Sequence, residues 1–115
     1  MMALPVIALG GAGLVSVASN EIPGEMARMV NAALAGDWAT ARTLHRRYFP
    51  LITANFWESS PGPVKSVMAM MGRLEENYRL PMVPVAPVTR QKLAALVKEL
   101  GLMPRGILIA KSPLL

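Results

Sequence analysis

The chain has 115 residues, enough for one ordinary domain and too few for a two-domain enzyme. Hydrophobic residues make up 53% and charged residues 17%, so the composition excludes an intrinsically disordered protein and predicts a packed core. The lack of cysteine excludes disulfides, thiolate nucleophiles and cysteine metal sites, and one histidine with seven acidic residues leaves little for any other metal site.

Residues 1–20 carry no charge, as in a signal peptide or a membrane span. The basic segment that begins a signal peptide is missing. A span needs roughly 20 mainly apolar residues, and Pro5 and the glycine-rich run Gly10–Gly13 interrupt this stretch. Leu14–Val17 is rich in β-branched residues and predicts a buried strand. We therefore expect a cytoplasmic protein without a membrane segment.

Four amphipathic helices are predicted after the strand, because apolar residues recur there at helical spacing. Proline, aspartate or threonine marks their starts, and glycine marks most of their ends. The predicted limits are Pro23 to Gly36, Asp37 to Phe56, Pro63 to Gly72 and Thr89 to Gly101. Pro50 lies inside the second pattern and should kink or divide that helix. The stretch Arg79–Val88 contains three prolines and predicts an extended connection.

The predicted order is a short helix or turn, one strand and four helices, so the fold class is mostly α. A lone strand that is buried on both faces leaves its backbone N–H and C=O groups unpaired, which is costly. The sequence therefore requires a sheet whose other strands it does not contain.

The net charge of +5 raises the question of nucleic-acid binding. Positive residues are spread along the chain, with one local cluster at Arg42, His45, Arg46 and Arg47. Such clusters usually form the solvated face of a helix, and no aromatic platform for single strands accompanies this one. We expect no nucleic-acid partner, and a small basic protein that binds anionic polymers is the weakest of the alternatives.

Four stretches stand out in order: Leu9–Asn20 (LGGAGLVSVASN), Pro23–Met26, Glu58–Lys65 (ESSPGPVK) and Arg79–Pro84 (RLPMVP). Together they resemble the last third of the dihydrodipicolinate synthases (4-hydroxy-tetrahydrodipicolinate synthases), a family of pyruvate-dependent aldolases. The resemblance runs from about residue 3 to residue 101. It implies a (β/α)₈ barrel with an appended helical domain, of which this chain is the C-terminal fragment.

The resemblance also implies a division of the chain. Residues 1–36 would be the remnant of the barrel, with a helix, the last strand and the last helix. Residues 37–103 would be the C-terminal helical domain, and residues 104–115 a tail. Val15 matches the strand position whose backbone carbonyl faces the bound ketoacid, and Gly10 and Gly11 match glycines that lead into that strand. The alternative is structural, with core packing for Val15 and backbone freedom for the glycines.

In this family a lysine forms an imine with pyruvate and a tyrosine relays protons, and both positions lie upstream of the matched region. We therefore expect no catalytic residue, cofactor or metal in this chain. Tyr48 should pack in the core, Tyr78 matches no relay position, and Lys65 should serve packing or a surface ion pair. The lysines, none at the imine-forming position, are Lys65, Lys92, Lys98 and Lys111.

The favoured hypothesis is a fragment of a Schiff-base-forming lyase that condenses pyruvate with aspartate semialdehyde in lysine biosynthesis. Its partners would be pyruvate in the complete enzyme, and either further copies or a complementing N-terminal chain. The alternative is a non-catalytic helical assembly module that folds by itself and docks on a barrel-containing partner, because three amphipathic helices in about 65 residues are enough for a marginal bundle, although cores this small are rarely robust.

Overall fold

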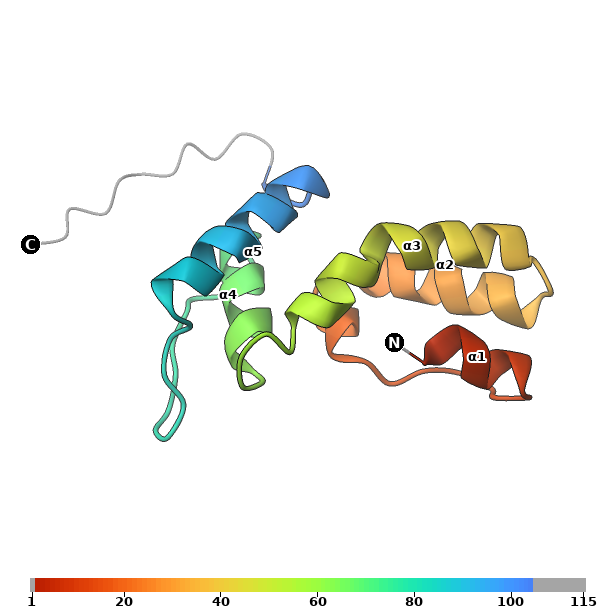
Figure 1. Ribbon diagram of the computed structural model, residues 1–115, viewed down its shortest axis with the longest axis horizontal. Coiled ribbons are helices and arrows are strands. Elements are labelled where there is room, and N and C mark those ends of the chain that lie inside the picture. Colours follow the sequence, from red (N-terminus) through yellow and green to blue (C-terminus); the bar gives the residue numbers. More distant parts are fainter. Residues whose placement is uncertain (1, 105–115) are drawn as a thin grey trace, which may run out of the picture.

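The computed structural model describes residues 2–104 and shows a mostly helical chain, as predicted. Figure 1 shows an elongated molecule, with α1, α2 and α3 at one end and α4 and α5 at the other. The elements are α1 (Ala3–Ala8), the 3₁₀ turn η1 (Val17–Asn20), α2 (Pro23–Leu34), α3 (Trp38–Ala54), α4 (Gly62–Met70) and α5 (Pro87–Glu99). The short N-terminal helix and the four later helices are confirmed.

A tight turn joins α2 to α3, and the two helices pack side by side in opposite directions (Figure 1). Gly36 has a φ of +82°, and its N–H and that of Asp37 bond back to carbonyls in the last turn of α2. The carboxylate of Asp37 then accepts the N–H of Thr40 at 3.1 Å and caps α3. The predicted stop and cap are confirmed, and Gly72 and Gly101 close α4 and α5 in the same way.

One predicted helix start is wrong, and of the two effects predicted for Pro50, a kink or a division, the division is absent. α3 runs through Pro50 without dividing, and the hydroxyl of Thr53 donates to carbonyls of the same turn, those of Phe49 at 3.1 Å and Pro50 at 2.9 Å. α5 begins at Pro87, two residues before the predicted cap Thr89. The fixed φ of proline suits the first turn of a helix, so this proline starts the helix rather than ending the connection before it.

The predicted strand is not formed, and residues 2–104 contain no β-strand. Residues 11–16 follow an extended course (Figure 1) but pair with no neighbouring strand, and Val17 and Ala18 enter η1 instead. Val15, predicted to be buried, is 102% exposed. The physical reason is that an extended segment becomes a strand only where a neighbouring strand pairs with its backbone N–H and C=O groups.

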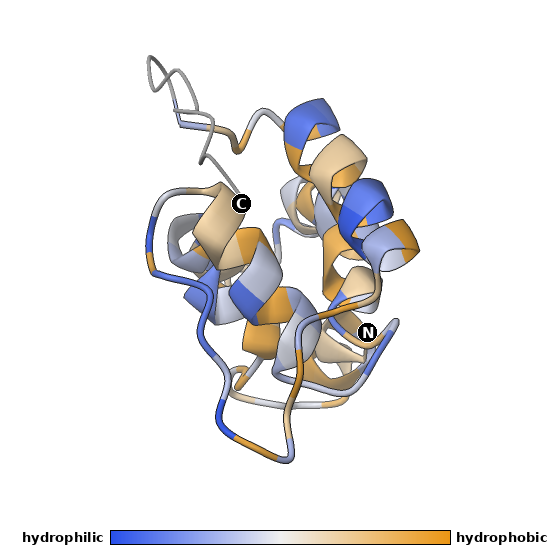
Figure 2. Cartoon of the chain, turned by 90° about the vertical axis from the view of Figure 1, so that its left-hand side faces the viewer, coloured by the Kyte–Doolittle hydropathy of each residue, from blue (hydrophilic) through white to orange (hydrophobic). Residues whose placement is uncertain are grey.

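The core is aliphatic and rich in methionine, and it lies between α2 and α3 and between α4 and α5. Figure 2 shows hydrophobic and hydrophilic residues alternating along the helices, as the predicted periodicity requires. Phe56, predicted as the last residue of the second helix, is 61% exposed because α3 ends at Ala54. The deeply buried apolar side chains include Met29, Leu51, Val67, Leu93 and Val97.

η1 lies at the junction of the two ends of the molecule, in contact with α2, α3 and α4. Arg73, just after α4, donates to the backbone carbonyl of Glu21 beside η1. The predicted division at residues 36 and 37 falls in the turn between two packed helices, and it stays a prediction. The predicted tail, residues 104–115, lies outside the described residues except for Pro104.

Candidate functional site

The predicted pocket-wall residue, Val15, lies in the extended segment of residues 11–16 between α1 and η1. Its full exposure means that core packing is not its role in this chain. Within residues 2–104, no hydrogen bond involves the backbone N–H or C=O groups of residues 12–15. A bare extended backbone of this kind is able to pair with another strand.

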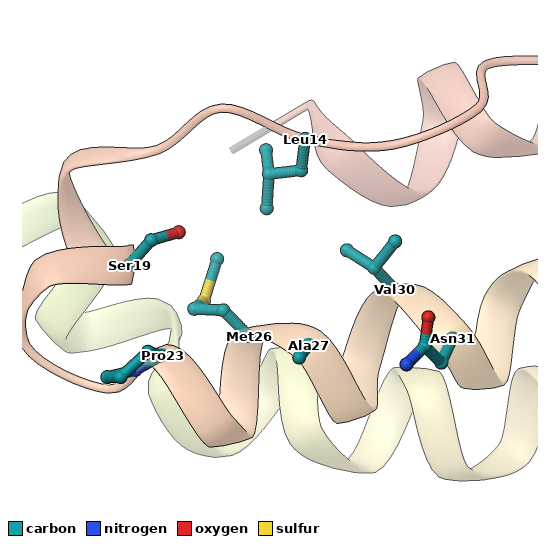
Figure 3. A pocket seen from close by; sticks show the side chains of 7 residues that line it. All are labelled: Leu14, Ser19, Pro23, Met26, Ala27, Val30 and Asn31. Atoms are coloured by element: carbon teal, nitrogen blue, oxygen red, sulfur yellow. The ribbon is translucent and has the colours of Figure 1, made fainter.

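An open, mainly apolar groove of about 220 Å³ lies between this segment and α2 (Figure 3). Leu14 faces Met26 and Val30 across it, so Leu14 points toward α2 while the next side chain along, that of Val15, is exposed. None of the lining side chains is ionisable, and the groove therefore offers no general acid or base. The lining residues are Leu14, Ser19, Pro23, Met26, Ala27, Val30 and Asn31.

The two glycines before this segment have a structural role. Gly10 adopts a φ of +100°, which disfavours other residues. At Gly11 an added Cβ would lie 2.7 Å from Val6 Cγ1 and 2.9 Å from Val6 O, and the N–H of Gly11 donates to that same carbonyl at 2.8 Å. Close approach of the backbone to α1 therefore requires glycine at position 11, in line with the structural interpretation.

The lysines provide no nucleophile in the groove, since none of those described lines it. The Lys65 ammonium on α4 donates to the carbonyl of Asn77 and lies 4.9 Å from the centre of the Tyr78 ring. The predicted packing role is confirmed, whereas Lys65 forms no ion pair within residues 2–104. The others are two exposed side chains on α5 and one outside the described residues, namely Lys92, Lys98 and Lys111.

Neither tyrosine is placed to relay protons. Tyr48 is 7% exposed and belongs to the core, as predicted. The hydroxyl of Tyr78 donates to the Glu76 carboxylate at 2.9 Å and lies 3.2 Å from the carbonyl of Gly62. Burial, followed by the hydrogen bond to Glu76, raises the pKa of Tyr78 to about 12. This tyrosine keeps its proton at neutral pH and holds the connection after α4 against the start of that helix.

Glu76 is the centre of a polar network that the sequence did not reveal. It accepts hydrogen bonds from Tyr78 and from the guanidinium of Arg90, which also donates to the hydroxyl of Ser66 at 3.3 Å. Burial raises the pKa of Glu76, but the hydrogen bonds from Arg90 and Tyr78 outweigh burial and leave the pKa below its ordinary value. The network joins α4, α5 and the connection between them, so its role is structural.

Glu21, which precedes α2, was also missed. Its side chain is fully buried, and its Oε2 accepts the amide of Asn55, the C-cap of α3, at 2.8 Å. Burial raises the pKa of Glu21 to about 7, although the Asn55 hydrogen bond and the charge of Arg73 both lower it. In the sequence, Glu21 looked only like part of the approach to a helix that begins at Pro23.

The remaining predicted features concern the surface. Arg42, Arg46 and Arg47 are exposed on α3, as expected for a solvated helix face, whereas His45, the fourth member of the predicted cluster, is half-buried. Among residues 2–104, no three His, Cys, Asp or Glu side chains are grouped closely enough to hold a metal ion. In the same part of the chain, no helix has both the length and the apolar character needed to cross a membrane.

The model of the dihydrodipicolinate synthetase family matches residues 1–100. The chain belongs to this family. A 4-hydroxy-tetrahydrodipicolinate synthase from Acidobacterium capsulatum is 71% identical over 102 residues, which cover 89% of this chain and 34% of that relative. The corresponding protein of Koribacter versatilis is 61% identical over 102 residues and is likewise covered over 34% of its length. The chain therefore spans about one third of the curated relatives it matches.

Solved dihydrodipicolinate synthases confirm the likeness of the fold. One crystal structure matches with a TM-score of 0.86 and 44% identity, over 89% of this chain and 35% of the other. The Acinetobacter baumannii enzyme, a complex with pyruvate, matches with a TM-score of 0.84 and 33% identity over the same shares. The Cyanidioschyzon merolae enzyme, which has lysine bound, matches with a TM-score of 0.83 and 33% identity, again over 89% and 35%. The described residues thus have the fold of part of a dihydrodipicolinate synthase.

Proposed function

We propose that this chain is the C-terminal third of a cytoplasmic dihydrodipicolinate synthase, an enzyme that condenses pyruvate with aspartate semialdehyde toward lysine. Residues 1–36 supply the last barrel strand and helix, residues 37–103 the helical domain, and residues 104–115 a tail. The imine-forming lysine belongs to the preceding part of the enzyme. The family match over residues 1–100, at one third of the relatives' length, supports this proposal.

The observation that carries the proposal is the alternation of side chains in the extended segment. Successive side chains of a strand point to opposite faces. Leu14 packs toward α2, and Val15 faces solvent. A barrel strand has helices on its outer face and packed side chains on its inner face. The Leu14 face is therefore the outer face, already covered by α2, and the bare Val15 face is the one that the missing strands would cover.

The chemistry of the described residues fits a chain that completes a site without catalysing in it. Imine formation needs a lysine whose amine is neutral near pH 7. The Lys65 ammonium is occupied by the carbonyl of Asn77 and the ring of Tyr78, and the described lysines of α5 are exposed. Val15 would contribute only its backbone carbonyl to the wall of the pyruvate pocket.

The partner that this proposal requires is a chain with the first seven barrel strands. It would pair with residues 12–15 by adding them as a strand at the edge of its sheet, a mode in which main-chain hydrogen bonds provide affinity. The exposed Val15 would be buried in the same step. Further copies of the completed unit would then form a homo-oligomer.

Co-expression tests the proposal. The full 115-residue chain is expressed with the N-terminal two thirds of the Acidobacterium capsulatum synthase, and the purified material is treated with pyruvate and borohydride. We expect a co-purifying complex that restores synthase activity and gains the mass of a reduced imine, located on a lysine of the N-terminal chain. The 115-residue chain alone should gain no mass. A labelled lysine in the chain alone would refute the assignment of the nucleophile.

A non-catalytic assembly module is the second candidate, favoured by the helix packing of α2 to α5, which gives the chain a core of its own. Such a module would bind a barrel-containing partner without restoring its activity. A complex that forms but stays inactive, although the lysine of the N-terminal chain is present, would support the module over the enzyme fragment. Failure of the two chains to co-purify would contradict both.

A further inference from the structure

Glu21 and Asn55 form a buried polar pair at the junction of the two ends of the molecule. They lie 34 residues apart in the chain, yet their side chains are 0% and 1% exposed, and the amide nitrogen of Asn55 donates to Glu21 Oε2 at 2.8 Å. Glu21 belongs to the segment between η1 and α2, while Asn55 caps the end of α3. The pair therefore joins the predicted barrel remnant to the predicted helical domain.

Within residues 2–104, the second oxygen on each side chain has no hydrogen-bond partner. Glu21 Oε1 and Asn55 Oδ1 are both buried, and neither takes part in a hydrogen bond within residues 2–104. A buried polar atom without a hydrogen bond destabilises the fold, and a buried charge does so more strongly. An ionised carboxylate has no proton to offer, so it leaves both oxygens unsatisfied. A single proton on Glu21 gives the acid a donor that matches the amide oxygen of Asn55.

We propose that Glu21 carries a proton on Oε1 and donates it to Asn55 Oδ1, so that acid and amide form a cyclic pair with two hydrogen bonds. This pair fastens the start of α2 to the end of α3 and weakens as the pH rises. The proposal is independent of the proposed function, because it concerns how this chain holds its own elements together.

Few other charges act on Glu21. η1 and the last turn of α3 carry no ionisable side chain, and the ammonium of Lys65 on α4 is bound at Asn77. Glu25, in the first turn of α2, is paired with Arg28 at 2.9 Å. The charge of Arg73 lowers the pKa of Glu21, but its guanidinium donates to backbone carbonyls rather than to the carboxyl group. Burial remains the larger effect.

The direction of the pH effect follows from the raised pKa. Glu21 has a pKa of about 7 in the folded chain against an ordinary 4.5, so the folded state holds the proton more tightly. Its contribution to stability is fully present below pH 4.5 and is lost as the pH rises through 7. The loss in the folding equilibrium is on the order of 100-fold, which corresponds to about 3 kcal/mol.

Glu21→Gln separates the protonated from the ionised state. Glutamine has the shape of the protonated acid, and its amide can donate to Asn55 Oδ1 while its carbonyl accepts the Asn55 amide at every pH. Glu25→Gln is the matched control, since it removes a half-buried carboxylate that is paired with Arg28 in the first turn of α2. The full chain and both variants are unfolded with urea between pH 5 and pH 9, and their glutamate carboxyl groups are titrated by carbon-13 NMR.

We expect the full chain and Glu25→Gln to lose stability between pH 5 and pH 8, on the order of 100-fold, and Glu21→Gln to lose far less. One glutamate resonance should titrate near pH 7 and be missing from Glu21→Gln alone. Titration of every glutamate near its ordinary pKa would overturn the proposal, whether or not the chain unfolds cooperatively. So would a Glu21→Gln variant less stable than the full chain at pH 8, or stability that depends on potassium or sodium, which would indicate an ionised carboxylate holding a cation.

Discussion

Val15→Asp is the substitution that best separates the role of the extended segment from the stability of the chain itself. The Val15 side chain is fully exposed and touches no core residue, so the isolated chain should keep its free energy of unfolding within about 0.5 kcal/mol. In a completed barrel the same side chain would be buried. Losing a buried valine costs about 1.5–3 kcal/mol, and burying an unpaired charge adds to that cost.

The expected result is an affinity for the N-terminal chain at least roughly 100-fold lower, since every 1.4 kcal/mol is tenfold. Val83→Asp is the matched control, because Val83 is 61% exposed and lies in the connection between α4 and α5. Affinity is measured by calorimetric titration, and stability by thermal unfolding followed by circular dichroism. Equal loss of affinity in both variants, or a melting temperature lowered by Val15→Asp alone, would refute the assignment of residues 12–15 as the pairing strand.

Two further matched pairs test the packing. Leu51→Ala should lower the free energy of unfolding by about 2–5 kcal/mol because Leu51 is 0% exposed. Leu34→Ala should lower it far less because Leu34 is 50% exposed. Urea unfolding measures both variants, and similar losses would contradict the core described above. Gly11→Ala should lower the free energy of unfolding by about 1–3 kcal/mol because the added Cβ would lie 2.7 Å from a methyl group of Val6. Gly13→Ala should keep the melting temperature of the unsubstituted chain, since no atom lies within 4 Å of its added Cβ.

The helix limits that the sequence predicted correctly depend on local chemistry. Glycine at position 36 adopts a positive φ whatever lies elsewhere, and the carboxylate of Asp37 reaches an N–H only three residues away. The wrong start predicted for α5 and the undivided α3 both concern proline, which acts in opposite ways by position. It starts α5 at Pro87, yet Pro50 is tolerated inside α3. Sequence spacing alone does not separate these cases.

The two polar contacts could not be predicted from the sequence because their partners lie far apart in the chain. Glu21 and Asn55 are 34 residues apart, and Glu76 and Arg90 are 14 apart, so nothing in the spacing of either pair predicts contact. A glutamate beside a helix start is usually solvated, whereas Glu21 is buried next to η1, which packs against α2, α3 and α4. The predicted site residue, Val15, came from family resemblance, and its role stays a proposal.

The failed strand is more informative than the confirmed helices. A helix forms its backbone hydrogen bonds within its own segment, so α2 to α5 need only the packing of their apolar faces to be stable. A strand depends on its neighbours for every backbone hydrogen bond, and for Val15 also for burial. Leu14 packs toward α2, whereas the Val15 side chain is exposed and the backbone groups of residues 12–15 form no hydrogen bond within residues 2–104. This exposure agrees with the proposed barrel strand, in which Leu14 lies on the helix-covered face and Val15 on the face that other strands would cover.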